Sequence, residues 1–567
     1  MASPSDFSPL PTSIRTILTT HTTPTTPPFR ARTGYTHRTW ARTFSSLPEL
    51  YIQPHTLAEI EHAVTLARHC RRRLTTVGSG HSPSDITCTS SWLLNLDRFS
   101  RVLAVDGATG LCTVEAGIRL RDLSAALDGE GLALPNLGSI DEQSVAGAIA
   151  TGTHGSSLRH GLVSECVVAL KVTMADGRTR ACSAEERPEL FRAALLSVGA
   201  LGVVTEVTLR AVPAFSLAWS QTIDADARLF EGWEDVLWKQ AEFVRVWWFP
   251  YMRRAVVWKA DRVEKEEIEA GRVRHSQPPT SFQDSRLGYI VYQNLLALAR
   301  WFPRVTPWIE WFVFGLNYGF RNGESTRVSG CQESYKAFLL NCLYSQFVNE
   351  WAIPLHKGPE ALQRLGAWLN RLQPGDPGYI DHRIPFSADG LWVHSPVEVR
   401  VSDTTVQTDS TTRNNRPFLD ITPDDGPALY LNATMYRPYY RDPPHEATER
   451  YYRAFEWLMR DLGGRPHWAK TFSVSPSEFA TWYGADWRRF CAVRDKADPE
   501  GMFVGPWHRR YLLGEGDASS SPSDSSEEGD DEKGLRRLAL EEVGFVHEKA
   551  KGGGIRVFGR QNPVVPA

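Results

Sequence analysis

The sequence contains few cysteines, and none of them form a pair with metal-binding or redox spacing. Eight cysteines are spread over 567 residues without a CxxC pattern. Zinc ribbons and redox dithiols need such pairs, so both are excluded and we expect no metal site. So few cysteines in so long a chain also argue against a disulfide scaffold and favour a reducing compartment.

The chain also lacks a net basic charge. Lys+Arg 63 against Asp+Glu 66 give a formal net charge of −3. Without an overall basic field the chain is a poor candidate for general nucleic-acid binding, so we expect no nucleic-acid partner. Eight acids and no base lie between Glu515 and Glu532. This Ser-rich, acidic stretch predicts a disordered tail over 514–567.

No hydrophobic run is long enough to cross a membrane, which takes about 20 apolar residues. The most apolar segment, 289–320, is interrupted by Arg300, Pro303, Arg304, Pro307 and Glu310. Two interpretations of this segment stay open. Aromatic side chains interleaved with arginine suit the surface of a membrane, and the same residues could form a buried helix pair that covers the active site.

The N-terminal segment lacks a charged start followed by an apolar stretch, which disfavours a secretory signal. Thr19–Pro28 is a Thr/Pro tract that predicts an extended linker inside a leader over 1–39. The arginines of 30–42 leave a mitochondrial address open. At about 150 residues per domain, the length predicts two to four domains.

One pattern that is present is a strand-like run followed by a glycine-rich turn. Residues 73–77 have the composition of a strand and lead into Gly78, Ser79, Gly80, His81 and Ser82. Such a turn lets backbone N–H groups approach an anion, as a phosphate cradle requires. The turn matches neither GxGxxG nor GxxxxGK(S/T), so a Rossmann or Walker site is excluded.

Two further glycine-rich segments follow in the same region of short strands and helices. Residues 136–156 combine glycines, which leave room for a ligand, with hydroxyl groups that could bind it. The glycines are Gly138, Gly147, Gly152 and Gly155, and the hydroxyl residues are Ser139, Ser144, Thr151 and Thr153. Residues 197–205 again place glycines before a strand expected over 203–209, with Gly202 before the strand and Val204 within it as candidate ligand-binding residues. Three such turns imply a long ligand that carries several phosphates.

The second half of the chain contains a strand-like run with two charges. Val397–Val401 alternates strictly, which puts Glu398 and Arg400 on one face and the valines on the other. Two opposite charges at this spacing are either a surface ion pair, worth less than about 1 kcal/mol, or part of a site. The residues alone leave both interpretations open.

The chain contains the motifs VGSGHSPSD (77–85), NLGSIDEQSVAGAIATGTHG (136–155), GALGVVTEVTL (199–209), FVNEWAIP (347–354), VEVR (397–400), GRPHWAK (464–470) and DPEGMF (498–503). Together these motifs resemble the vanillyl-alcohol-oxidase (PCMH-type FAD) superfamily and, within it, the sugar-1,4-lactone oxidases, most closely the fungal D-arabinono-1,4-lactone oxidases. It implies an α+β fold with a two-subdomain PCMH-type FAD-binding domain over 40–214. A substrate (cap) domain with a mixed or antiparallel sheet is expected over 215–513.

The resemblance also implies the chemistry. FAD is the expected cofactor, bound covalently through His81, and the expected reaction is oxidation of D-arabinono-1,4-lactone and related lactones at C2 by O2. Relatives that do not use oxygen have alanine at the position of Gly138, and that alanine restricts the approach of O2 to the flavin. Gly138 leaves this approach open, which implies an oxidase that forms H2O2. Glu398 is then the group that orients or deprotonates the C2 hydroxyl. Arg400 and Lys470 hold the carbonyl and the reduced flavin, two roles that the sequence does not divide between them.

Other polar residues of the motifs are expected to be structural. Glu350 and Trp351 are interpreted as core or pocket wall, and His154 as a residue that shapes a backbone turn. His508 lies near the end of the similar region and is given no role.

Two other functions stay open. One is a covalent-flavin alditol or secondary-metabolite alcohol oxidase, because alditol oxidases share similar Glu/Arg and Lys motifs. The other is a catalytically inactive, membrane-associated flavin-binding protein, against which the retained motifs argue. The resemblance implies a mitochondrial membrane location with peripheral association, and the cytoplasm is the alternative. The sequence identifies no protein partner and does not fix the preferred lactone.

Overall fold

The computed structural model describes residues 7–514 except 277, 279–280, 341, 343, 394–395, 406–415 and 425. Contacts along the chain divide it into two units, Met1–Ser521 and Pro522–Ala567, and the described residues all belong to the first. The acidic tail predicted for 514–567 lies outside the described residues from position 515 on.

A four-stranded sheet positions the first glycine-rich turn. Its order is β1 (Ala31–Arg32), β4 (Leu50–Ile52), β6 (Trp92–Asn95) and β5 (Leu74–Val77). The last three strands are parallel, and residues 78–82 follow directly from β5. Helix α2 (Leu57–His69) begins after Thr56, whose side chain accepts from the Glu59 N–H at 3.3 Å. Its apolar face is buried, because apolar residues recur there with helical spacing.

The start of the chain is packed on this region rather than extended. Helix α1 (Thr12–His21) contains the first residues of the Thr/Pro tract and contacts α2. Ile14 and Leu18, one helical turn apart, are buried. The predicted linker is therefore wrong for Thr19–His21, because the apolar pair just upstream holds the helix on the protein.

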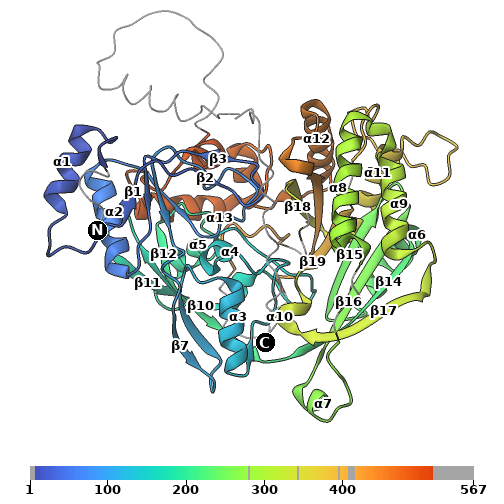
Figure 1. Ribbon diagram of the computed structural model, residues 1–567, viewed down its shortest axis with the longest axis horizontal. Helices are drawn as coiled ribbons and strands as arrows, with labels where there is room; N and C mark the ends of the chain where they lie inside the picture. The colour runs from blue at the N-terminus through green and yellow to red at the C-terminus, as the bar shows by residue number, and fades with distance from the viewer. Residues whose placement is uncertain are drawn as a thin grey trace, which may run out of the picture. The chain divides into compact units, whose positions relative to one another are not determined.

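A second sheet of five strands carries the third glycine-rich turn. All of its pairs are antiparallel, in the order β11 (Thr179–Ser183), β10 (Val167–Thr173), β12 (Val203–Arg210), β8 (Leu111–Glu115) and β7 (Val102–Asp106). The accompanying elements are α3 (Leu120–Gly129), α4 (Val145–Ala150), α5 (Pro188–Ala194), and the small pairs β2 (His37–Arg38) with β3 (Ser45–Ser46) and β9 (Leu132–Ala133) with β13 (Val212–Pro213). In Figure 1 the labelled members of this set, among them β7, β10, β11, β12, α3, α4 and α5, lie in the same half of the picture, in blue and teal.

The second half of the chain builds an eight-stranded antiparallel sheet. Its order is β17 (Gly323–Glu333), β14 (Ser216–Ala225), β16 (Arg254–Val263), β15 (Phe243–Phe249), β19 (Val397–Ser402), β20 (Ala428–Tyr436), β18 (Gln346–Pro354) and β21 (Arg465–Pro466). Short helices α6 (Asp226–Glu231), α7 (Lys265–Glu269) and α10 (Ser334–Ala337) lie at its connections. The strand order differs strongly from the chain order, so residues far apart in sequence become neighbours on the sheet.

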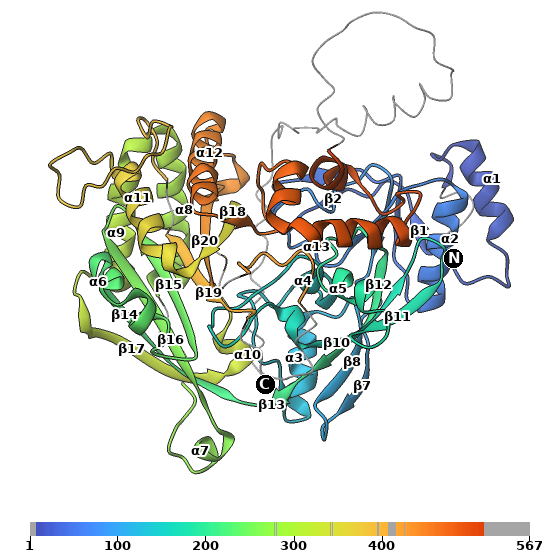
Figure 2. The same cartoon turned by 180° about the vertical axis from the view of Figure 1, so that it is seen from behind.

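Helices cover both faces of this sheet (Figures 1 and 2). On one face lie α11 (Gly358–Asn370) and α12 (His445–Asp461), and Asn349 of β18 donates to Glu456 of α12 at 2.7 Å. On the other lie α8 (Arg286–Trp301) and α9 (Thr306–Tyr318), with the ring of Phe314 5.0 Å from that of Phe249 on β15. The α8–α9 hairpin corresponds to segment 289–320, for which the sequence left open a membrane-surface segment or a buried helix pair.

The inner face of the hairpin is buried and its outer face is exposed. Tyr292, Leu296, Ile309 and Val313 belong to a buried cluster, whereas large aromatic residues face outward. Covering the sheet and presenting an aromatic surface are therefore compatible. Among the described residues, no helix combines the length and apolar character that crossing a bilayer requires.

After the large sheet the chain returns to its first half. Helix α13 (Pro476–Ala497) contacts α5, and the Leu74 N–H donates to Met502 O at 2.9 Å. Helix α14 (Pro506–His508) follows. The last described residues thereby complete the region of the glycine-rich turns.

Candidate active site

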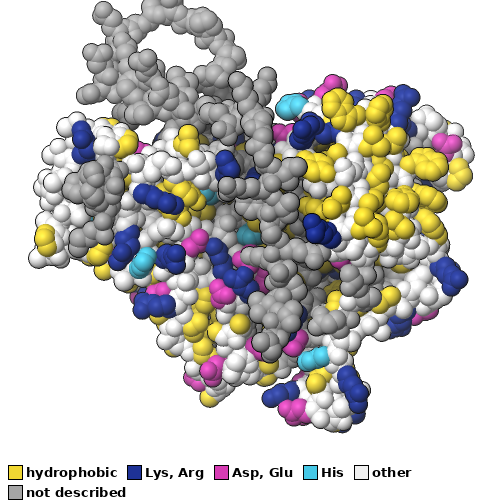
Figure 3. Space-filling view, in the orientation of Figure 1, with side chains coloured by type: hydrophobic (Ala, Val, Ile, Leu, Met, Phe, Trp, Pro, Cys, Tyr) yellow, Lys and Arg dark blue, Asp and Glu magenta, His cyan; other side chains and the backbone are white. Residues whose placement is uncertain are grey.

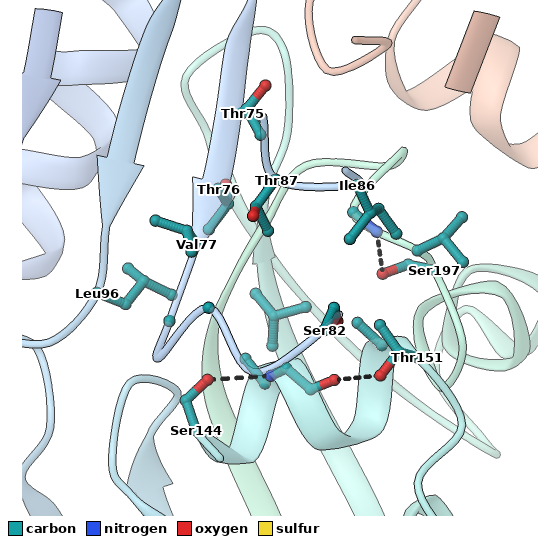
Figure 4. A pocket seen from close by; sticks show the side chains of 18 of the residues that line it. Thr75, Thr76, Val77, Ser82, Ile86, Thr87, Leu96, Ser144, Thr151 and Ser197 are labelled. Carbon is teal, nitrogen blue, oxygen red and sulfur yellow. Dashed lines mark hydrogen bonds between the residues drawn. The ribbon is translucent and has the colours of Figure 1, made fainter. Parts of the chain in front are cut away.

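Three glycine-rich turns surround one cavity, which Figure 4 shows from close by. Its empty volume, including space open to solvent, is about 880 Å³. Ten of the predicted cofactor-binding residues line it: Gly78, Ser79, Gly80, His81, Ser82, Ser144, Gly147, Thr151, Gly202 and Val204. The turn after β5, the start of α4 and the start of β12 thus meet at one place.

Close packing requires the glycine at position 78. A Cβ atom there would lie 2.0 Å from Ser144 Oγ. Ser144 caps α4, since its hydroxyl accepts from the Gly147 N–H at 3.3 Å, and Thr151 Oγ1 donates to Gly147 O at 3.0 Å (Figure 4). The turn and the helix start are fitted together, which leaves mostly backbone along this wall of the cavity.

The other five predicted residues lie beside the cavity rather than in its lining. They are Gly138, Ser139, Gly152, Thr153 and Gly155, on either side of α4. A Cβ atom at Gly155 would lie 1.9 Å from Asn136 Oδ1. Thr153 Oγ1 accepts from Gln143 Nε2 at 3.3 Å, and Gln143 itself lines the cavity. Thr153 is thus in contact with a residue of the lining.

Two residues near the end of the described chain also line the cavity, and sequence reasoning missed them. They are Phe503 and His508. His508 Nε2 lies 2.7 Å from Val198 O, and its Nδ1 accepts from the Gly505 N–H at 3.1 Å. Burial lowers the pKa of His508 to about 4, so the ring is neutral at neutral pH. DPEGMF was the only nearby signal, and nothing in it points to the distant turns.

His81 presents an unused nitrogen beside this cavity. Its Nδ1 is buried and has no hydrogen-bond partner among the described residues, and its ring stacks on Trp40 with 5.2 Å between centroids. Burial, with smaller effects of Arg119 and Lys470, lowers the pKa of His81 to about 4. A neutral imidazole nitrogen can act as a nucleophile. His81 Nδ1 is also a buried polar atom that a bound ligand could engage.

A cluster of charged side chains lies on the eight-stranded sheet. Glu350 of β18 and Glu398 of β19 are both in register with Asn432 of β20. Arg400, two residues beyond Glu398, shares its face, as the alternation predicts. Lys470 joins the cluster from the chain that follows β21. The structure thus brings together the three predicted catalytic residues.

The charged cluster and the cavity are linked. Ser84 Oγ, just after the first glycine-rich turn, donates to Ala469 O at 3.1 Å. Lys470 is also among the groups that lower the pKa of His81. The first turn and the charged residues therefore belong to one site.

Glu350 is the anion at the centre of the cluster. Arg400 Nη2 donates to Glu350 Oε1 at 2.6 Å, and Lys470 Nζ lies 3.3 Å from Glu350 Oε2. Burial alone would raise the pKa of Glu350, but Arg400 and Lys470 outweigh it and hold that pKa well below its ordinary value. Glu350 is buried, as expected for a core residue, and it also holds both cations. The signal for it was an acid in the middle of an otherwise apolar strand.

Glu398 is less firmly engaged. Its Oε1 is buried and has no hydrogen-bond partner among the described residues. The nearest cationic groups are Arg245 Nε, at 3.7 Å from Oε1, and Arg400 Nε, at 3.7 Å from Oε2. A buried carboxylate oxygen without a donor is ready to accept a hydrogen bond from a ligand.

Two histidines complete the cluster. His154 Nε2 lies 3.3 Å from Glu350 Oε1, and its ring stacks on Tyr430 with 3.5 Å between centroids. Burial lowers the pKa of His154 to about 4, and burial lowers that of His467 well below its ordinary value. Ligand atoms of His154, Glu350 and His467 lie within 4.8 Å of one another, close enough to share a metal ion. The carboxylate already faces two cations, which disfavours a third.

Family models match most of the chain. The model described as "D-arabinono-1,4-lactone oxidase" matches residues 207–511, and the model described as "FAD binding domain" matches residues 48–183. The first covers Glu350, Glu398, Arg400 and Lys470, and the second covers the first two glycine-rich turns. The chain belongs to the D-arabinono-1,4-lactone oxidase family.

Individual proteins of the D-arabinono-1,4-lactone oxidase family agree along nearly their whole length. A provisionally named D-arabinono-1,4-lactone oxidase of Neurospora crassa is 65% identical over 95% of this chain and 94% of its own. The D-arabinono-1,4-lactone oxidases of Yarrowia lipolytica and Saccharomyces cerevisiae are 39% and 36% identical, each over 84% of this chain and 96% of its own. The resemblance seen in the motifs is therefore confirmed.

Among solved structures, the chain is similar to cholesterol oxidase from Brevibacterium sterolicum. The TM-score is 0.67 with 16% identity, over 87% of this chain and 99% of that one. At this identity the likeness concerns the fold alone. With the antiparallel sheets described above, it confirms the predicted α+β class with a PCMH-type FAD-binding fold.

Proposed function

We propose that this protein is an FAD-dependent aldonolactone oxidase. It oxidises D-arabinono-1,4-lactone and related aldono-1,4-lactones at C2 with O2, and gives dehydro-D-arabinono-1,4-lactone (D-erythroascorbate) and H2O2. Family membership supports this proposal. The observation that carries it is that Glu398 Oε1, beside Arg400 and in the cluster that Lys470 joins, has no hydrogen-bond partner among the described residues. The chain next to Lys470 contacts the first glycine-rich turn through Ser84 and Ala469.

The residues around the cavity fit FAD. The wall is formed where the glycine at position 78 meets the capped start of α4, so a long ligand would lie against backbone. Buried polar atoms without partners among the described residues, Thr76 Oγ1 and His81 Nδ1, are available to such a ligand. FAD would be held by these residues and by those lining the cavity, and when bound it supplies the acceptor for two electrons and their transfer to O2.

We also propose that FAD is attached covalently through His81. The free nitrogen and the lowered pKa of His81 support this, because they keep the imidazole unprotonated and nucleophilic at neutral pH. The test is a denaturing gel of the purified holoenzyme. We expect flavin fluorescence to migrate with the wild-type polypeptide and to be lost from it in His81→Ala. A wild-type band without fluorescence would refute the covalent bond.

Glu398 would act on the C2 hydroxyl of the lactone. The Glu398 carboxylate can accept a hydrogen bond from this hydroxyl. It can therefore orient the hydroxyl and take its proton as C2 is oxidised. Glu350 is less suited to this task, because its cations lie at 2.6 Å and 3.3 Å, whereas Arg245 and Arg400 each lie 3.7 Å from Glu398. The burial of Arg400 strengthens its interactions with groups around it.

Arg400 and Lys470 would hold negative charge. One fixed cation can bind the lactone carbonyl, and the other can stabilise charge that develops during the reaction. Glu350 and the backbone of β19 hold Arg400 in place, and Glu350 also holds Lys470. The two roles remain undivided between them.

The division of the chain is also part of the proposal. We infer an FAD-binding domain over 40–214 and a substrate domain over 215–513. The change from the smaller sheets to the eight-stranded sheet between β13 and β14 supports a boundary near residue 214.

The activity is tested by measuring H2O2 with D-arabinono-, L-galactono- and L-gulono-1,4-lactone, and with xylitol. We expect H2O2 from the lactones, and their relative rates show which lactone is preferred. Activity on xylitol alone would replace this function by that of an alditol oxidase. No activity on any of them, with flavin bound, would favour an inactive flavin-binding protein.

For the location we propose a mitochondrial membrane with peripheral association, and the cytoplasm is the alternative. The motif resemblance and the arginines of 30–42 support it. Fractionation of fungal cells that produce the tagged protein tests it. Recovery with the cytosol would refute it.

A further inference from the structure

The outer face of the α8–α9 hairpin is unusually apolar. Half of the large hydrophobic side chains that are exposed among the described residues lie between 287 and 320. Its aromatic members, here called the aromatic face, are Trp301, Phe302, Trp308, Trp311, Phe312 and Phe320. Figure 3 shows hydrophobic side chains gathered on this side of the molecule, over α8 and α9. Contiguous apolar patches of this kind mark interaction surfaces in soluble domains.

The aromatic face is held by the fold. Trp301 and Trp308, at the two sides of the hairpin turn, are 74% and 73% exposed. The ring of Trp311 stacks on that of Phe320 with 5.1 Å between centroids. On the inner side, Tyr344 Oη donates to Tyr289 O at 2.9 Å, which ties α8 to the body of the protein. The surface is therefore presented in a fixed orientation.

Within residues 285–322 the exposed charges are all positive, and the exposed acids just outside this stretch, Asp284 and Glu324, are engaged by Ser281 and Arg327. Arg286, Arg304 and Arg321 are exposed, whereas Glu310, the one acid between 285 and 322, is 4% exposed. No hydrogen bond or ion pair among the described residues engages the side chains of Arg286 and Arg304. A rim of arginines around exposed tryptophans is complementary to a negatively charged surface with an apolar layer beneath it.

We propose that the aromatic face of the α8–α9 hairpin docks on a bilayer that contains anionic phospholipid. The aromatic side chains enter the boundary between headgroups and acyl chains, and the arginines bind the phosphates. A second copy of the chain is a poorer partner, because pairing two such faces would bring two arginine rims together. This inference rests on the membrane association proposed above and gives it a surface and a lipid chemistry.

The test is co-sedimentation of the full-length holoenzyme with vesicles of phosphatidylcholine alone or mixed with phosphatidylserine. We expect stronger binding to the mixed vesicles, weakened by salt. The double variant Trp301→Ser/Trp308→Ser should lower binding to them at least about tenfold. Arg286→Glu/Arg304→Glu should remove the preference for the anionic lipid. The control Leu47→Ser, which removes a side chain 65% exposed outside the hairpin, should bind like the wild type.

Three results would overturn the proposal. The first is unchanged binding in the tryptophan variant, and the second is equal binding of the wild type to both kinds of vesicle. The third is a wild-type dimer that the tryptophan variant makes monomeric, without binding to vesicles. Lactone oxidation in vesicle-free buffer is measured in parallel and should be unchanged in all variants. Sedimentation needs no turnover, so loss of docking and failure of the oxidase assignment are distinguishable.

Discussion

Arg400 donates a hydrogen bond to Glu350, with 2.6 Å between Nη2 and Oε1, and both side chains are buried. Lys470 faces the other oxygen of the same carboxylate at 3.3 Å. Two cations thus depend on one anion, while Glu398 beside them is held less closely, with Arg245 and Arg400 each at 3.7 Å and Oε1 without a hydrogen-bond partner among the described residues. One acid of the site holds its neighbours, and the other is available to substrate.

Glu350→Gln should destabilise the fold. The variant leaves Arg400 and Lys470 without their buried counter-charge, a loss that costs about 3–5 kcal/mol for buried pairs. Urea unfolding followed by tryptophan fluorescence measures it, with Glu266→Gln on exposed α7 as the control that should not change. A free energy of unfolding equal to that of wild type would show that Glu350 does not carry the cations.

Glu398→Gln should slow the reduction of bound flavin by lactone by about 10²–10⁴-fold, because the amide cannot take the proton of the hydroxyl. Anaerobic stopped-flow absorbance of the flavin measures the rate. Glu398→Asp keeps a carboxylate on a shorter side chain, so the rate of flavin reduction should fall less than in the Gln variant. Reduction of the Gln variant at the wild-type rate would remove the assignment of Glu398 as base.

Gly138→Ala should slow reoxidation of the reduced enzyme by O2 while leaving turnover with an artificial dye acceptor intact. The new methyl group would lie 2.9 Å from Thr153 Cγ2, so a packing effect has to be separated from an effect on oxygen. Thr153→Ser removes that methyl contact and keeps the hydroxyl. If the double variant Gly138→Ala/Thr153→Ser regains full oxygen reactivity, the cause is packing and the idea of an oxygen gate fails.

Glu310→Gln should flatten the pH dependence of stability. Both carboxylate oxygens of Glu310 are buried without a hydrogen-bond partner among the described residues, and burial raises its pKa from 4.5 to about 8. The folded protein therefore holds a proton that the unfolded chain releases above 4.5. This contribution to stability is complete below pH 4.5 and is lost as pH rises through 8, by up to about 1.4 kcal/mol per pH unit. Urea midpoints across this range measure it, and an unchanged slope in the variant would contradict it.

The glycine-rich turns were readable from the sequence because their requirement is local. A strand, a turn and a small residue follow one another, and position 78 has room for nothing larger. The shared face of Glu398 and Arg400 follows from strand alternation in the same way. The motif resemblance added Lys470, which no local rule could place beside them.

The partners of these residues depend on strand order and register. Glu350 reaches Arg400 because β20 lies between β18 and β19, an arrangement that no pattern within β18 encodes. His508 could not be assigned to the cavity either, because its contact with Val198 joins segments 310 residues apart in the chain. The two interpretations of 289–320 both described real properties, since one face of the hairpin is buried and the other exposed.

The return of the chain to its first half has a consequence for biosynthesis. Phe503 and His508 close a cavity whose other walls lie between residues 75 and 204, and His508 is bonded to Val198. During translation those walls leave the ribosome long before the segment that closes them. The nascent chain therefore has no complete flavin pocket until more than 500 residues have been made. A chain that ends before Phe503 would therefore lack one wall of the cavity.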